Sequence, residues 1–189
     1  MPRKVVASTY LTLDGFIDEP GRWSFPFWSE EASQLKAREL FASDALLLGR
    51  ITYQGFAAAW PTMEGTGEFG EKMNAMPKFV ASRTLTEASW NATIIEGEVA
   101  DTVRRLKLAD GGDLLIEGSG QLIDYLTWHD LIDEYRLMIY PLVLGDGRRR
   151  LFTTVTNRSF SLVDTLPLPK GVVVTTYRLL PKPDAPASS

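Results

Sequence analysis

Short apolar runs alternate with amphipathic stretches along the first two thirds of the chain. The runs are typical of buried strands, and they cover residues 4–10, 45–48, 78–81, 93–95 and 114–116. Apolar residues at every third or fourth position predict helices over residues 29–42, from about 49, over 98–107 and behind 120. Strands that alternate with helices in this way favour an α/β sheet in which most strands are parallel.

The pattern changes after Trp128. Residues 131–140 predict a long strand with alternating side chains, and residues 158–163 and 172–179 predict two more strands with no helix between them. Strands joined without a crossover helix pair antiparallel. We therefore expect a mixed, mainly parallel sheet with helices on both faces and an antiparallel C-terminal strand pair.

Length and composition favour a single domain over residues 1–180, because the chain has 189 residues and no evident linker. Residues 181–189 are rich in Pro, Ala and Ser and predict a disordered tail. Residues 60–76 are rich in Gly, Pro, Glu and Met and predict a mobile surface connection.

Several classes of function are disfavoured by composition. The net charge is −4, which argues against nucleic acid as a partner. The chain has no cysteine and one histidine, which argues against a zinc site, so we expect no metal. There is no signal-peptide core and no apolar run approaching ~20 residues, so we expect no membrane partner and a cytoplasmic location.

The stretch with the most chemical information is Leu114–Leu122, where an apolar strand runs into Gly118-Ser119-Gly120 and a predicted helix. Glycines let backbone approach a ligand closely. Unpaired amides at a helix start attract anions, most often phosphate in an enzyme. The alternative is an ordinary strand-to-helix turn capped by Ser119.

Two other strand ends carry groups suited to phosphate. Gly49-Arg50-Ile51-Thr52 follows one strand and Ser82-Arg83-Thr84 follows another. The planar fork of arginine matches phosphate geometry. Three such strand ends predict a ligand with several phosphates, although each arginine alone is equally compatible with a solvated surface charge.

An aromatic cluster follows the first strand and its Asp14-Gly15 turn. Trp23, Phe25, Phe27 and Trp28 lie among prolines and a glycine, which indicates a loop. The cluster predicts either a small packed core or subunit contact, or a pocket wall that stacks on a flat ring.

Taken in order, five motifs resemble those of the dihydrofolate reductase-like family, in particular the reductase domain of riboflavin biosynthesis and its stand-alone relatives. The motifs are Leu13-Asp14-Gly15, Leu48–Tyr53, Ser82–Thr84, Glu117–Gly120 and Pro141–Gly147. The resemblance implies a three-layer sheet that binds NADPH across its strand ends. It also implies a small-molecule substrate and a homodimer, for which the strand over residues 131–140 offers an exposed-looking surface.

The resemblance assigns a role to each loop. Gly49, Arg50 and Thr52 would hold phosphate groups, Ser82 and Arg83 would contact the 2′-phosphate, and the loop after the first strand would lie by the nicotinamide. The full set of implied cofactor-binding residues is Thr12, Leu13, Ile17, Gly49, Arg50, Thr52, Ser82, Arg83, Thr84, Glu117, Gly118, Ser119, Gly120, Gln121 and Leu122. Trp23, Phe27 and Trp28 are the candidate substrate residues.

Two features depart from the family pattern. Dihydrofolate reductase proper carries a pteridine-binding carboxylate in its first helix, whereas this chain has Ser33 and Gln34 there, with Glu30 and Glu31 out of register. Asp146 also places a negative charge in a turn expected to be all glycine. The folate-binding acid is therefore not transferred to this chain.

We expect an NADPH-dependent reductase that transfers a hydride to a small planar, pterin- or pyrimidine-like substrate. Tyr10 and Asp14 are the candidate catalytic proton donors. Glu117 is a third candidate, or it accepts hydrogen bonds from backbone amides near its turn. The alternatives are a nucleotide-binding module without catalysis and a dimerisation module that keeps the fold.

Overall fold

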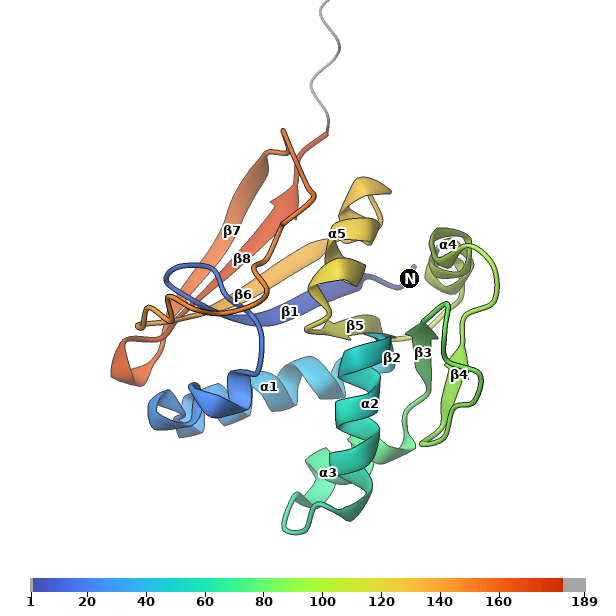
Figure 1. Ribbon diagram of the computed structural model, residues 1–189, viewed down its shortest axis with the longest axis horizontal. Coiled ribbons are helices and arrows are strands. Elements are labelled where there is room, and N and C mark those ends of the chain that lie inside the picture. Colours follow the sequence, from blue (N-terminus) through green and yellow to red (C-terminus); the bar gives the residue numbers. More distant parts are fainter. Residues whose placement is uncertain (1, 182–189) are drawn as a thin grey trace, which may run out of the picture.

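An eight-stranded mixed sheet runs through the computed structural model, which describes residues 2–181 (Figure 1). The strands lie in the order β4-β3-β2-β5-β1-β6-β8-β7. Their bounds are β1 Val5–Thr12, β2 Ser43–Gly49, β3 Lys78–Ala81, β4 Ala92–Ile94, β5 Asp113–Glu117, β6 Glu134–Tyr140, β7 Phe160–Pro167 and β8 Val173–Leu179. The first six strands are parallel to one another, and β8 is antiparallel to both β6 and β7. The predicted fold class is thus confirmed, while most of the predicted tail lies outside the described residues.

Helices cover both faces of the sheet (Figure 1). They are α1 Glu30–Phe41, α2 Arg50–Ala59, α3 Gly67–Ala75, α4 Val99–Leu108 and α5 Gly120–Trp128. Successive strand residues point to opposite faces, so β2 gives Leu46 and Leu48 to the core under α1, α2 and α3. It gives Ala45 and Leu47 to the core under α4 and α5. No helix of the described part is long and apolar enough to cross a membrane.

The prediction of a mobile connection over residues 60–76 is wrong. This segment forms a short 3-10 helix and then α3, in which Gly70 and Met73 are buried. Phe69, Met73 and Met76 recur at helical spacing and pack on the core beside α2. The abundance of Gly and Glu concealed this short apolar stripe.

The strand predicted over residues 131–140 begins at Glu134 and lies inside the sheet. β6 is hydrogen-bonded to β1 on one side and β8 on the other. The expectation that this strand is exposed and available for pairing is therefore wrong. The edge strands are β4 and β7, and β7 carries the exposed side chains Leu162, Val163 and Leu166.

Candidate functional site

Four loops lie side by side at one edge of the sheet. Neighbouring parallel strands β3, β2, β5 and β1 all end at this edge, so Ser82, Gly49, Gly118 and Leu13 follow one another along it. The sequence predicted that the three phosphate-compatible strand ends would converge, and the topology confirms it. Hydrogen bonds and side-chain contacts join several of these loops.

Ser119 joins two of the loops directly. Its Oγ accepts a hydrogen bond from the Gly49 amide at 2.8 Å and donates one to Thr52 Oγ1 at 2.8 Å. Ser119 is the residue that precedes α5, but its side chain makes no capping bond to that helix. The interpretation that Ser119 caps α5 is therefore wrong. Its hydroxyl instead fixes the spacing between the start of α2 and the start of α5.

Two residues of this turn have left-handed backbone. Gly118 has φ 66° and Ser119 has φ 65°, a conformation that costs a non-glycine residue roughly 1–2 kcal/mol. The strain at Ser119 is offset by its two hydrogen bonds to the neighbouring loop. This turn connects β5 to α5. It leaves the first amides of α5, which have no partner within the helix, at the edge of the sheet.

The loop after β1 packs against the first residue of α5. A Cβ at Gly120 would lie 2.6 Å from Ile17 Cδ1, so only a hydrogen leaves room for this contact. The Ile17 amide donates to the Arg149 carbonyl at 3.0 Å, which ties the loop to the segment after β6. Ile17, Gly118 and Gly120 are thus brought together as expected, whereas the side chain of Leu122 turns into the core.

The third loop is held by its own serine. Ser82 Oγ accepts hydrogen bonds from the Thr84 amide at 3.2 Å and the Leu85 amide at 2.9 Å. Arg83 and Thr84 are exposed. Arg50 is also exposed and donates to Gln54 Oε1 at 3.1 Å. Neither arginine forms an ion pair within residues 2–181, so both guanidinium groups are available to an anionic ligand.

Asp14 has a structural role in the loop after β1. Its carboxylate accepts hydrogen bonds from Thr12 Oγ1 at 2.5 Å, the Gly145 amide at 2.8 Å and the Leu144 amide at 3.2 Å. The bond from Thr12 and those from the two amides lower the pKa of Asp14 to about 2. The side chain is therefore ionised at neutral pH and holds the loop by accepting these bonds, while its catalytic role stays a prediction.

Most of the aromatic cluster forms a small packed core. Trp23 is 7% exposed, and its ring meets Tyr140 edge-on at 5.3 Å. Phe27 also meets Tyr140 edge-on, at 6.1 Å between ring centroids. Trp28 packs on Tyr10 at 6.0 Å, and its Nε1 donates to Ser33 Oγ. The packed-core interpretation holds for Trp23, while Phe27, Trp28 and Tyr10 remain partly exposed beside it.

Tyr10 keeps its phenol proton. Burial raises the pKa of Tyr10 far above its ordinary value, and the nearby positive charge of Lys36 only partly opposes this effect. Lys36 Nζ lies 5.4 Å from the centroid of the Tyr10 ring. The Tyr10 side chain points to the α1 face of the sheet, where a group of buried charges lies.

A buried ion-pair cluster under α1 is the part of the site that sequence analysis missed. Lys36 Nζ donates to Ser8 Oγ at 2.8 Å, Glu39 Oε2 at 2.8 Å and Glu117 Oε1 at 2.7 Å. Glu117 therefore binds a lysine rather than the backbone amides near its turn, and that expectation is wrong. One signal was present, because Lys36 continues the buried stripe of Ala32 and Leu40 at a spacing of four.

Opposing effects set the charges in this cluster. Burial disfavours the charge on Lys36, but Glu117 and Glu39 outweigh it and raise the pKa of Lys36. Burial also raises the pKa of Glu117, and Lys36 offsets only part of that rise. The pKa of Glu39 is lowered, because Lys36 and Arg136 outweigh the effect of burial. Of the two carboxylates, Glu117 is therefore the more readily protonated.

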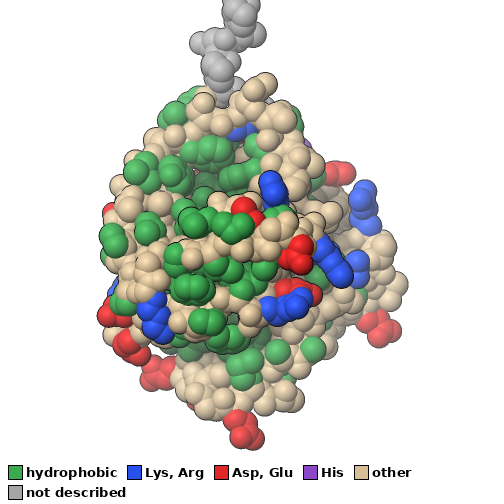
Figure 2. All heavy atoms as spheres, turned by 60° about the vertical axis from the view of Figure 1, so that its left-hand side comes forward, with side chains coloured by type: hydrophobic (Ala, Val, Ile, Leu, Met, Phe, Trp, Pro, Cys, Tyr) green, Lys and Arg blue, Asp and Glu red, His purple; other side chains and the backbone are tan. Residues whose placement is uncertain are grey.

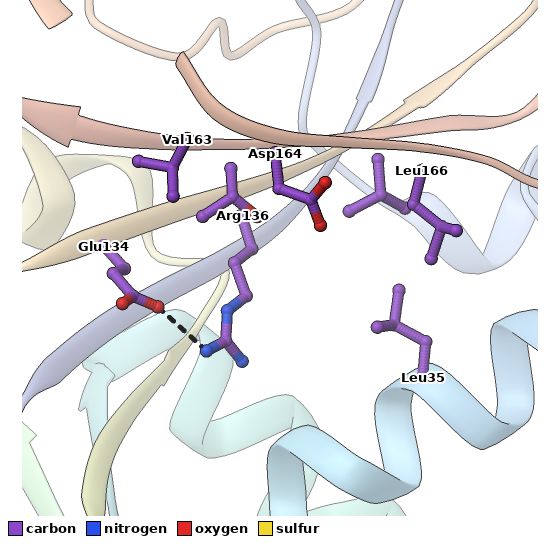
Figure 3. A pocket seen from close by; sticks show the side chains of 8 residues that line it. Leu35, Glu134, Arg136, Val163, Asp164 and Leu166 are labelled. Carbon is purple, nitrogen blue, oxygen red and sulfur yellow. Dashed lines mark hydrogen bonds and ion pairs between the residues drawn. The ribbon is translucent and has the colours of Figure 1, made fainter. Parts of the chain in front are cut away.

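The cluster continues away from the loops into a hollow (Figure 3). Arg136 Nη1 lies 3.6 Å from Glu39 Oε1, and Arg136 Nη2 donates to Glu134 Oε2 at 2.9 Å. The hollow has a volume of about 290 Å³ between α1 and the β6–β8–β7 part of the sheet. Its lining consists of Leu35, Glu134, Arg136, Val163, Asp164, Leu166, Val174 and Thr176. Since Glu134 and Arg136 neutralise each other there, Asp164 is the charged group left without an ion pair within residues 2–181.

Two solved structures are similar to this chain over most of its length. A crystal structure of a candidate riboflavin biosynthesis protein from Shewanella sp. PV-4 matches with a TM-score of 0.75 and 21% identity, covering 96% of this chain and 100% of that one. Dihydrofolate reductase from Enterococcus faecalis, complexed with NADP(H) and RAB-propyl, matches with a TM-score of 0.64 and 15% identity, covering 93% and 96%. At these identities the likeness concerns the fold.

Sequence comparison gives the family. The Bacillus subtilis (strain 168) protein YyaP, which is uncharacterised, is 29% identical over 180 residues, or 93% of this chain and 94% of YyaP. The family model described as the RibD C-terminal domain matches residues 3–174, which is most of the chain and includes all four loops and the buried cluster. The chain therefore belongs to the RibD C-terminal domain family.

Proposed function

We propose that the chain is an NADPH-dependent reductase that transfers a hydride to a small planar substrate with a pyrimidine- or pterin-like ring. The observation that carries this proposal is the linkage of the Gly49 and Gly118–Gly120 loops through Ser119. It places two helix starts next to each other at the sheet edge, where α/β sheets hold ligands.

The loop geometry fits a dinucleotide with several phosphates. The first hydrogen bonds of α5 are donated by Leu122 and Ile123 to the Ser119 carbonyl, so the Gly120 and Gln121 amides precede them and are available to a ligand. In this proposal the start of α5 holds the pyrophosphate, with Thr52 and Arg50 beside it, and Arg83 contacts the 2′-phosphate. The loop with Thr12, Leu13 and Ile17 covers the nicotinamide, which supplies the hydride when bound.

The substrate half of the proposed site is the part of the α1 face of the sheet beside Glu117 and Tyr10. Glu117 is the last residue of β5 and is followed directly by the Gly118 turn. Its Oε1 binds Lys36, while its Oε2 accepts no hydrogen bond from the described residues. A carboxylate oxygen suits the N–H edge of a pyrimidine or pterin ring. Side chains of this chain would thus orient the ring against the cofactor, which is most of what hydride transfer requires.

The experiment is to follow NADPH oxidation with pyrimidine, pterin and quinone substrates and to titrate NADPH by calorimetry. We expect turnover with at least one ring substrate and a loss of roughly 100-fold in kcat/KM in Glu117→Gln, since a hydrogen bond to a charged group is worth about 1.5–3 kcal/mol. Glu98→Gln is the matched control, because the Glu98 side chain accepts a hydrogen bond from Tyr125 at the surface and from no other residue among 2–181. NADPH binding without turnover would favour the non-catalytic nucleotide module, and absence of binding would favour a dimerisation module.

We further propose that the protein is a homodimer. The exposed apolar residues Leu162, Val163 and Leu166 on the edge strand β7 support this assembly. Figure 2 shows the side of the molecule that carries β7, with hydrophobic side chains spread over it. Light scattering should give twice the 21.1 kDa mass of one chain, and a mass of 21.1 kDa at micromolar concentration would contradict the proposal.

A further inference from the structure

Lys36 uses its whole hydrogen-bonding capacity inside the molecule. An ammonium group has three donors, and those of Lys36 are directed to Ser8 Oγ, Glu39 Oε2 and Glu117 Oε1 at 2.8, 2.8 and 2.7 Å. The side chain is 6% exposed. Lys36 therefore has no proton left for a substrate, and any effect on the reaction must act through a neighbour.

Of the two carboxylates that Lys36 binds, only Glu117 adjoins the loops. Glu39 is 2% exposed and is fully enclosed by Lys36, Ser8 and Arg136. The Glu117 side chain is 18% exposed and belongs to the residue before the Gly118 turn. Lys36 thus binds both a buried carboxylate, that of Glu39, and a partly exposed one, that of Glu117.

The groups that face Glu117 come from three elements. They are Lys36 and Glu39 on α1, Ser8 and Tyr10 on β1, and, behind Glu39, Arg136 on β6. Lys36 is the cation in contact with Glu117, while Glu39 adds a negative charge behind it. The balance between these two residues decides whether Glu117 is an acceptor or a donor of hydrogen bonds.

We propose that Lys36 is a positioning residue of the reductase site, and that its three hydrogen bonds hold the Glu117 carboxylate charged and in one orientation toward the substrate ring. The inference rests on the proposed function, since it names the device that prepares Glu117 for its substrate. Without Lys36, two buried carboxylates would face each other, and one of them would take a proton. A protonated Glu117 would present an O–H where the ring N–H needs an acceptor.

The test is the titration of the Glu117 carboxyl, followed by NMR of protein labelled with carbon-13 at the glutamate carboxyl, with Glu117→Gln identifying the resonance. Replacing Lys36 by Met should move the midpoint up by about 1–3 pH units, since a neighbouring opposite charge is removed. Replacing Glu39 by Gln should move it down, since a like charge is removed. The second variant keeps the test decisive if Lys36→Met folds poorly.

The matched control is Lys4→Met. Lys4 also binds a glutamate, Glu134 Oε1 at 3.1 Å, but among residues 2–181 it forms no ion pair with Glu117, and its side chain is 53% exposed. It should leave the Glu117 midpoint unchanged. A purely structural role for Lys36 predicts lower melting temperatures in both cluster variants with no movement of the Glu117 midpoint, and that result would overturn the proposal.

A second readout separates this inference from the proposed function. The acid limb of the kcat/KM profile for NADPH oxidation should move with the NMR midpoint, up in Lys36→Met and down in Glu39→Gln. If the native chain binds no NADPH, the proposed function fails whatever the titration shows. If NADPH binds and turns over, but neither the midpoint nor the acid limb moves, only the role of Lys36 fails.

Discussion

The half of the candidate site that we propose for the cofactor is made mainly of backbone, whereas the half that we propose for the substrate is made of buried side chains. In the first half, the turn at Gly118 and the bonds of Ser119 bring amides to the sheet edge. In the second half, Lys36 joins Glu39 and Glu117 beneath α1. Backbone amides are fixed by turn geometry and carry no titratable charge. The protonation of each buried charged group, in contrast, depends on the charges beside it. The two halves should therefore respond differently to mutation and pH.

The largest difference concerns stability. Removing Lys36 leaves Glu117 without its cation and Glu39 with Arg136 alone, and breaking a buried pair costs about 3–5 kcal/mol. Lys36→Met should lower the free energy of unfolding by this amount in urea titrations. The double variant Lys36→Met/Glu39→Gln should recover part of it, because one of the carboxylates has been neutralised. A cost below about 1 kcal/mol would show that the cluster is effectively solvated.

The next difference concerns the choice of cofactor. If Arg83 contacts the 2′-phosphate, Arg83→Ala should weaken NADPH binding by about 2 kcal/mol, a ratio on the order of thirty, and leave NADH binding nearly unchanged. Arg50→Ala is the matched control, because Arg50 is proposed to bind a phosphate present in both cofactors. Calorimetry with both cofactors measures this. Equal losses in Arg83→Ala would place the 2′-phosphate elsewhere.

A smaller effect is expected from the hydroxyl that joins the two loops. Ser119→Ala removes the bonds to the Gly49 amide and to Thr52 Oγ1, and we expect about 1 kcal/mol of lost stability and a several-fold weaker affinity for NADPH. Thr52→Val removes only the second bond and should cost less. Thermal unfolding with and without NADPH measures both effects, and identical behaviour of the two variants would mean that the Gly49 bond is dispensable.

The last predicted effect is confined to acid pH. Burial would raise the pKa of Glu134, but bonds from Arg136, Lys4 and Arg178 lower it from 4.5 to about 2. A depressed pKa gives stability that is present above the unfolded value and lost as pH falls. Stability should thus decline between about pH 4.5 and 2, and this decline should be shallower in Glu134→Gln. Parallel acid-unfolding curves for the two proteins would contradict this assignment.

Sequence analysis predicted the fold and the convergence of the strand-end loops because both depend on local patterns. Gly118-Ser119-Gly120 follows its strand directly, and parallel strands necessarily end at one edge, so the loops could be brought together without knowing any side-chain contact. The role of Ser119 was not predictable, since its partners are 70 and 67 positions away. The contact between Ile17 and Gly120 was not predictable for the same reason, because the two residues are far apart in the sequence.

The buried cluster could not be predicted in the same way. Ser8, Lys36, Glu39 and Glu117 come from one helix and two strands, and a lysine in a helix is ordinarily solvated. The structural bonds of Asp14 were not predictable either, because its partners, the Leu144 and Gly145 amides, lie 130 and 131 positions away. Helix α3 was also missed, because the abundance of Gly and Glu in residues 60–76 outweighed its short apolar stripe.

The most direct test of the central claim is calorimetric titration of NADPH into the native chain, Gly118→Ala and Gly55→Ala. Gly118 has positive φ at the proposed pyrophosphate site, whereas a Cβ at Gly55 would meet nothing within 4 Å. We predict saturable binding to the native chain, a loss of at least about tenfold in Gly118→Ala, equivalent to about 1.4 kcal/mol, and unchanged affinity in Gly55→Ala. Absence of NADPH binding to the native chain, or equal affinities for all three proteins, would contradict the account.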